Sequence, residues 1–364
     1  MKSLIIDGLK IPVPIIQGGM GVGVSLSGLS SAVANEGGVG VISATGIGMH
    51  ENDFFQNFMG ANKRILVNEI KTARSKTSGV IGVNLMVALS DYDELLRSVY
   101  DAQVDMVFVG AGLPLRLPDT ITIDIVKNSA TKFVPIVSSA RAINIIFKSW
   151  EKNYNYIPDA VVVEGPLAGG HLGFKKEQID SEDYSLDKIL TEIQPVLGAY
   201  MDKYEKDIPV IAAGGIYNGA DIYRVMQLGA SGVQMGTRFV ATDECDASIK
   251  FKETYVDSSK EDITIIKSPV GLLGRAIKNE FLSKIERGEK HKFKCPCKCL
   301  KSCNFATASY CIALALVNAK QGNLDEGFAF AGHNAYKIDK IVSVKELFNT
   351  LIEEYSQAAL SSAE

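Results

Sequence analysis

Short runs rich in valine and isoleucine recur along most of the chain, and they constrain its fold more than any other feature. Eight of them are predicted strands: Val13–Gln17, Gly38–Ser43, Val80–Val87, Met106–Val109, Phe133–Val137, Ala160–Glu164, Pro209–Ala213 and Gly232–Met235. Because these runs are apolar along their length, the strands are expected to be covered on both faces, as in a parallel sheet. Helical periodicity between them makes eight βα units, which predict a closed (β/α)8 barrel, the TIM-barrel architecture.

The segments between or after these strands have the apolar spacing of helices. They are Leu26–Asn35, Asn52–Ser75, Asp91–Ala102, Ile121–Ser129, Ala140–Glu151, Asp187–Tyr204 and Gly219–Leu228. An open, doubly wound sheet is the alternative architecture. It is disfavoured because the glycines after the first strand, GGMGVG, lack the GxGxxG spacing of a dinucleotide-binding turn.

The βα rhythm ends after Met235 and divides the chain into three parts. Residues 1–240 are the predicted barrel core. Residues 241–330 carry no strong strand signal and contain the lysine-rich stretch KIERGEKHKFKCPCKCLKSC and an apolar helix candidate, Cys311–Ala319, so we interpret them as an inserted lid. Residues 331–364 are expected to return to the barrel with a last helix, Val344–Ala358.

Composition narrows the class of partner. With 46% hydrophobic and 22% charged residues the chain is globular and not disordered, and a formal net charge of -4 argues against nucleic acid or an anionic membrane surface. A small-molecule substrate is the expected partner, and a homodimer stays open as the assembly. The first residues have too short an apolar run for a signal peptide, so we expect a cytoplasmic protein with reduced thiols.

Glycines at the ends of the last two strands predict a phosphate site. In such barrels phosphate is usually held by the loops after strands seven and eight. Strand seven runs into AAGGIYNG, where Gly214 and Gly215 let backbone amides approach an anion and the helix near Gly219 is expected to point its positive end toward it. Strand eight ends in QMGTRF, where Gln234 precedes Gly236 and Thr237. Tight βα turns are the alternative explanation for these glycines.

Residues 161–174, VVVEGPLAGGHLGF, supply the best candidate for chemistry. The chain has four histidines, and His171 follows Gly170 in a glycine-dense loop at a strand end. Its ordinary pKa of about 6.5 suits an acid, a base or a hydrogen-bond donor. A loop histidine bonded to a backbone carbonyl is the alternative. Asn84, in the third strand, has an amide that suits the edge of a heteroaromatic ring, or that is simply satisfied inside the barrel.

The thiols are concentrated in the lid. Five of the six cysteines are Cys295, Cys297, Cys299, Cys303 and Cys311. Their CxCxC spacing matches neither the CxxC pairs of zinc sites nor ferredoxin patterns, so no metal ligands are predicted. A surface-exposed thiol patch, or a lid stabilised by other means, is favoured over a metal site, which stays open as an alternative.

Taken together, several motifs resemble the nitronate monooxygenase (2-nitropropane dioxygenase) family, which includes the flavin-dependent enoyl-acyl-carrier-protein reductases. The motifs are PIIQGGMG, GVNLMV, VVEGPLAGGHLG, the segment from VIAAGGIYNG to VQMGTRF, GRAIKN and AFAG. The resemblance implies an FMN-containing barrel. It places the FMN phosphate at Gly214, Gly215, Gly236 and Thr237, the isoalloxazine along Gln17, Gly19, Met20 and Asn84, and His171 above the ring as the catalytic residue. The cysteine-rich insert departs from the family pattern.

The leading functional interpretation is an FMN-dependent nitronate monooxygenase, which oxidises alkyl nitronates with O2 to carbonyl compounds and nitrite. The alternative is NAD(P)H-dependent reduction of enoyl thioesters, toward which GRAIKN (Gly274–Asn279) leans. A third hypothesis is a non-catalytic flavin and thiol redox sensor. The phosphate loops and His171 serve the first two equally, so the choice between O2 and a nicotinamide is expected to depend on the lid.

Overall fold

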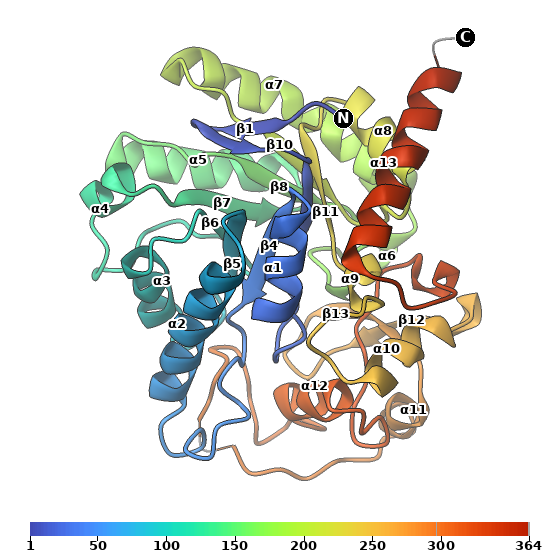
Figure 1. The fold of residues 1–364 in the computed structure, drawn as a ribbon. Helices are drawn as coiled ribbons and strands as arrows, with labels where there is room; N and C mark the ends of the chain where they lie inside the picture. The colour runs from blue at the N-terminus through green and yellow to red at the C-terminus, as the bar shows by residue number, and fades with distance from the viewer. Residues whose placement is uncertain (296, 363–364) are drawn as a thin grey trace.

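The computed structural model describes residues 1–295 and 297–362 and contains a closed barrel of eight parallel strands (Figure 1). Around the barrel the order is β3, β4, β5, β6, β7, β8, β10 and β11, and β11 pairs with β3 to close it. Their bounds are β3 (Ile15–Gln17), β4 (Val39–Ser43), β5 (Val80–Met86), β6 (Met106–Gly110), β7 (Lys132–Val137), β8 (Val161–Glu164), β10 (Val210–Ala213) and β11 (Gly232–Met235). The eight predicted strands and the barrel are confirmed.

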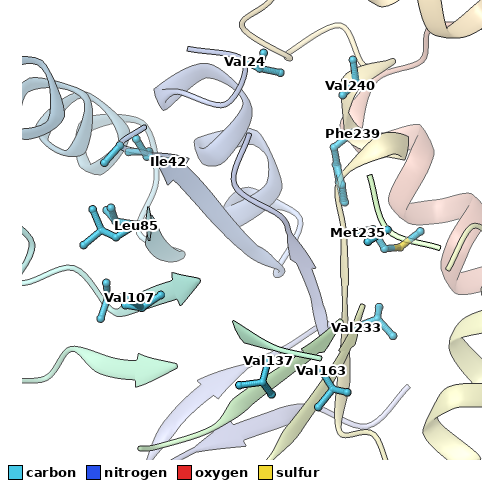
Figure 2. Close-up of a cluster of buried hydrophobic side chains, with 14 of the residues drawn as sticks. Val24, Ile42, Leu85, Val107, Val137, Val163, Val233, Met235, Phe239 and Val240 are labelled. Carbon is cyan, nitrogen blue, oxygen red and sulfur yellow. The ribbon is translucent and has the colours of Figure 1, made fainter. Parts of the chain in front are cut away.

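Each strand buries both of its faces, which explains why its sequence is apolar throughout. On β8, Val162 belongs to a cluster inside the barrel, whereas Val161 and Val163 belong to the larger cluster between strands and helices. Figure 2 shows part of this outer cluster, with side chains from successive strands arranged around the barrel. The period-2 alternation therefore decides which residues face the barrel interior.

Helices surround the barrel at the predicted places. They are α1 (Ser27–Asn35), α2 (Phe58–Lys76), α3 (Tyr92–Asp101), α4 (Ile123–Asn128), α5 (Ala140–Tyr154), α7 (Leu186–Tyr204) and α8 (Gly219–Gln227). Helix α2 begins at Phe58, later than the predicted start at Asn52. The side chain of Asn57 accepts a hydrogen bond from the amide of Gly60 (3.2 Å), so Asn57 caps the helix and the residues before it form turns.

A hairpin that the sequence analysis did not predict closes one end of the barrel. Strands β1 (Leu4–Ile6) and β2 (Leu9–Ile11) pair antiparallel, and Leu4, Ile6 and Ile11 join the cluster inside the barrel. In Figure 1 this hairpin lies at the opposite end of the molecule from residues 241–330. The other end of the barrel, where the strands finish, is thus the one that the lid segment approaches.

Residues 241–330 contain strands although their sequence carries no strong strand signal. Besides α10 (Ile249–Val256), α11 (Glu280–Glu286) and α12 (Ile312–Lys320), they contain β12 (Ile263–Lys267) and β13 (Leu273–Ile277). These two strands form a sheet with the two-residue strand β9 (Gly170–His171) of the loop after β8. The second partner of β13 is β9, which has two residues and lies far away in the sequence. Such a pairing leaves little local sequence pattern from which the sheet could be predicted.

The chain returns to the barrel with α13 (Val344–Ser361), as predicted. It packs against α8 and α1. The approach to α8 is close at Gly219, because a Cβ there would lie 2.1 Å from the backbone nitrogen of Tyr355. None of the helices that the structure describes has the length and apolar character needed to span a membrane.

Candidate active site

A cavity of about 260 Å³ lies where the barrel strands end. Its walls come from the loops after β3, β8, β10 and β11 and from residues 330–334. The predicted site residues that line it are Gly19, Met20, Gly170, Gly214, Gly215, Gln234, Gly236 and Thr237. The structure therefore brings together most of the residues that were proposed from four separate motifs.

The loop after β10 approaches the cavity with its backbone. Gly214 and Gly215 have φ angles of +88° and +84°. A Cβ would lie 2.8 Å from the carbonyl oxygen of Gly165 at the first position and 2.9 Å from Cβ of Leu167 at the second. Both glycines are therefore required by conformation and by space. Within the described part of the chain, their amides and that of Gly236 have no hydrogen-bond acceptor.

Several amides at and just before the start of α8 already have acceptors within the protein. The amides of Tyr217 and Asn218 donate to the carboxylate of Asp221 at 2.9 and 3.3 Å. The amide of Gly219 donates to Oε2 of Glu354 at 2.8 Å. The helix is capped by its own residues and by α13, so the amides of the preceding glycines are the free donors nearest to the cavity. The expectation that the positive end of the helix points toward an anion stays a prediction.

Arg238 is a candidate phosphate ligand that sequence reasoning missed. It belongs to the short helix α9 (Thr237–Val240), lines the cavity, and holds its guanidinium 4.4 Å from the ring centre of Tyr217. Its Nε is buried without a hydrogen-bond partner among the described residues. An unpaired buried donor is costly, so a ligand atom is a natural acceptor for it. The signal was in the sequence, since Arg238 lies within the QMGTRF motif.

Thr237 and Asn334 connect the phosphate loops to the C-terminal segment. The amide of Gly332 donates to Oγ1 of Thr237 at 2.9 Å, which leaves the hydroxyl hydrogen free to donate to a ligand. The Asn334 side chain donates to the carbonyl oxygen of Gly215 at 2.7 Å. Neighbouring His333 also lines the cavity, although the sequence analysis had assigned it no role. Burial, with the positive charge of Arg275, lowers the pKa of His333.

The carboxyl ends of the strands place polar side chains on the cavity floor. On β8 the interior-facing position after Val162 is Glu164, and on β11 Gln234 has the corresponding place. Both line the cavity. Burial raises the pKa of Glu164 to about 7. Sequence reasoning noted Glu164 only as the end of an apolar run.

His171 lies next to the cavity wall and does not itself line the cavity. Its Nε2 is 2.9 Å from Oγ of Ser268, and its ring packs edge-on against Phe330, whose side chain does line the cavity. The backbone of His171 pairs with Gly274 of β13. Burial lowers the pKa of His171 to about 4, so the imidazole is neutral at pH 7. Its position depends on the β12–β13 hairpin, which supplies both Ser268 and Gly274.

Arg275 holds the loop that carries these residues. Its side chain is 3% exposed, and its Nη1 donates to the carbonyl oxygens of Pro166 (2.6 Å) and Ala168 (2.7 Å). Burial lowers the pKa of Arg275 to about 10, so it remains charged at pH 7. A buried cation bonded to two loop carbonyls fixes the path of the chain between β8 and β9.

Two predicted cofactor residues do not line the cavity. The Gln17 amide is buried, accepting from the amide of Val41 (2.9 Å) and donating to the carbonyl oxygen of Gly18 (2.5 Å). Asn84 lies directly under Gly19, where an added Cβ would be 2.3 Å from Cβ of Asn84. Both therefore support the loop after β3 from below.

The lid cysteines are free thiols with an irregular backbone. Lys298, between Cys297 and Cys299, has a φ of +44°. Burial, together with the neighbouring thiols, raises the pKa of Cys299. Among the residues that the structure describes, no three histidine, cysteine, aspartate or glutamate side chains are arranged to hold a metal ion.

The chain was compared with known families and structures. The model of the nitronate monooxygenase family matches residues 2–354. A probable nitronate monooxygenase of Staphylococcus aureus is 26% identical over 324 residues, covering 79% of this chain and 81% of that protein. FabK from Thermotoga maritima is 27% identical with a TM-score of 0.74, covering 97% of this chain and 96% of the other.

A nitroalkane oxidase from Streptomyces ansochromogenes shares the fold with a TM-score of 0.70 at 23% identity, covering 96% of this chain and 98% of that one. Because the family model extends over nearly the whole chain, the barrel and the lid are both part of the match. The chain belongs to the nitronate monooxygenase family and is an oxidoreductase.

Proposed function

We propose that this protein is an FMN-dependent nitronate monooxygenase, which uses O2 to oxidise alkyl nitronates to carbonyl compounds with release of nitrite. The observation that carries the proposal is the set of unused donors at the ends of β10 and β11. The free amides of Gly214, Gly215 and Gly236 and the unpaired Nε of Arg238 surround one cavity. Such a set suits the phosphate of a flavin mononucleotide.

The residues present fit that cofactor. Gly214, Gly215, Gly236, Thr237 and Arg238 would hold the phosphate. A Cβ at Gly236 would have only Sδ of Met20 within 4 Å, at 3.9 Å, so the glycine leaves open space there. When bound, FMN supplies the electron transfer chemistry.

The isoalloxazine would lie along other parts of the same wall. Gly19 and Met20 line one side of the cavity, and Gln234 and Glu164 line its floor. Gln17 and Asn84 would act indirectly, because they hold in place the loop that carries Gly19. The flat isoalloxazine ring would make its polar contacts at its edge, with the backbone and side-chain amide groups of this wall.

His171 would bind the substrate as a neutral imidazole. With Nε2 bonded to Ser268, Nδ1 remains to interact with a nitronate oxygen. A nitronate has already lost its carbon proton, so its oxidation needs no strong base at this position. A pKa near 4 agrees with a binding role better than with deprotonation of a neutral nitroalkane.

NAD(P)H-dependent reduction of enoyl thioesters is the second candidate. The GRAIKN segment resembles that of the flavin-dependent enoyl-acyl-carrier-protein reductases. Its residues Gly274–Ile277 belong to β13, where Gly274 pairs with His171. The similarity to FabK covers 97% of the chain. These observations favour a site in which a nicotinamide reduces the flavin.

Anaerobic mixing separates the two candidates. The purified yellow protein is mixed with an alkyl nitronate, NADH or NADPH in separate runs, and the flavin absorbance is followed. We expect bleaching by the nitronate and release of nitrite when O2 is admitted. Rapid bleaching by a nicotinamide without any reaction of nitronate would instead assign the reductase activity, and a colourless protein that binds no added FMN would refute the cofactor.

A further inference from the structure

Glu164 is a carboxyl group that the proposed chemistry leaves unused. It is the last residue of β8, and the alternation of that strand directs it toward the barrel interior above Val162. Its neighbour in register on β10 is Ala213, which is apolar, and the next strand presents Gln234. The Glu164 side chain lines the cavity without a hydrogen bond or ion pair to any described residue.

No charged side chain among the described residues contributes to the pKa of this carboxyl. The other ionisable groups on the cavity wall are Tyr217, Arg238, Tyr255 and His333. Burial is the sole cause of the raised pKa of Glu164, about 7, with no contribution from those four groups. The carboxyl therefore stands near the midpoint of its titration at neutral pH, where a small change in local charge alters its protonation.

His171 cannot take the same role. Its pKa of about 4 leaves it neutral across the physiological range, and acquiring a proton there would require a strongly acidic medium. Glu164 lines the cavity proposed for the flavin, and its carboxyl can gain or lose a proton near neutral pH.

We propose that Glu164 binds a proton from water when the flavin is reduced and releases it when the flavin is reoxidised. The inference rests on the proposed FMN site. A hydride donor, such as the nicotinamide of the second candidate function, delivers two electrons and one proton, so the flavin would gain one negative charge. The ionised carboxyl then binds one proton, and the net charge of the cavity is unchanged. Like charges in a poorly solvated cavity repel strongly, and this repulsion drives the proton uptake.

The test measures the two-electron reduction potential of the bound flavin from pH 6 to pH 9. One additional proton per two electrons changes the reduction equilibrium tenfold per pH unit, or about 30 mV. In the wild-type holoprotein we expect this additional slope above pH 7, where Glu164 is ionised in the oxidised state. Glu164→Gln, which keeps the shape of the side chain, should lack the additional slope. Glu182→Gln, an exposed carboxylate outside the cavity, should retain it. Equal slopes in all three proteins would overturn the proposal.

An infrared measurement on the wild-type protein tests the proposal without any variant. At pH 8 the reduced-minus-oxidised difference spectrum should gain the C=O band of a protonated carboxylic acid, shifted in D2O. Its absence would overturn the proposal even if Glu164→Gln failed to fold. A protein that binds no FMN would refute the cofactor assignment, whereas a yellow protein without the additional slope and the band would refute only the role of Glu164.

Discussion

Replacing Gly214 with alanine tests the geometry of the proposed phosphate loop. At φ +88° the residue is in a backbone region that L-residues rarely adopt, and the new Cβ would be 2.8 Å from the carbonyl oxygen of Gly165. It would also lie 3.2 Å from the amide nitrogen of Ala168. The loop cannot move aside easily, because Arg275 is bonded to the carbonyls of Pro166 and Ala168.

The effect has two parts that a matched control separates. Adopting a left-handed backbone costs an L-residue about 1–2 kcal/mol. Overpacking against a fixed loop adds about 1–3 kcal/mol. Gly288 has a φ of +89° and no atom within 4 Å of an added Cβ, so Gly288→Ala carries only the first cost. We therefore expect Gly214→Ala to lower the free energy of unfolding by about 2–5 kcal/mol and Gly288→Ala by about 1–2 kcal/mol.

The overpacking at Gly214 is also expected to displace the loop that lines the cavity. A loop shift worth about 1–3 kcal/mol corresponds to a Kd for FMN raised by about 5- to 150-fold. The assay is titration of apoprotein with FMN by fluorescence quenching, beside urea denaturation of each apoprotein. Gly288→Ala should keep the wild-type Kd. If Gly214→Ala bound FMN as tightly as Gly288→Ala does, the assignment of this loop to the cofactor would be wrong.

Four further predictions address the other parts of the site. His171→Ala should keep FMN bound and lower turnover at least tenfold, by an order-of-magnitude expectation for a lost substrate contact; equal turnover would show that the histidine is structural. Arg238→Met should weaken FMN binding by about 1.5–3 kcal/mol and leave riboflavin, which has no phosphate, unaffected; equal losses for both ligands would contradict a phosphate contact. Arg275→Met leaves two buried carbonyls unpaired and should lower the free energy of unfolding by about 1–3 kcal/mol for each, with partial rescue by Arg275→Lys in urea denaturation. Because burial lowers the pKa of His171 to about 4, the neutral form contributes stability above pH 6.5 that is lost as the pH falls toward 4. The wild type should therefore lose more unfolding free energy than His171→Asn between pH 7 and pH 4.5, and parallel losses would refute the shift.

Local patterns were sufficient for the barrel because its strands and helices have strong periodicity. The eight barrel strands were located to within about two residues, since each apolar run is buried on both faces. The N-terminal hairpin was missed because its strands are three residues long and alternate only briefly. The sheet of the lid was missed for a related reason, since β9 has two residues and lies far along the chain from β12 and β13.

The candidate site was only partly predictable. Glycine pairs at strand ends have a local cause in backbone conformation, and the structure shows that cause at Gly214 and Gly215. The roles suggested for Gln17 and Asn84 as direct ring contacts stay predictions, with both side chains placed beneath the cavity wall. Arg238 lies inside the QMGTRF motif and His333 follows AFAG, but nothing in the sequence shows that the two side chains line the same cavity.

The sequence by itself determined the closed barrel, the family and the two glycine loops, because each of these follows from residue types at fixed short spacings. Only the tertiary structure decided the state of the individual groups. His171 is neutral because burial beside a distant hairpin lowers its pKa, and Glu164 titrates near neutrality because burial at the mouth of the barrel raises its pKa to about 7. Protonation depends on surroundings that the fold assembles from segments far apart in the sequence, as the 97-residue separation of His171 and Ser268 shows.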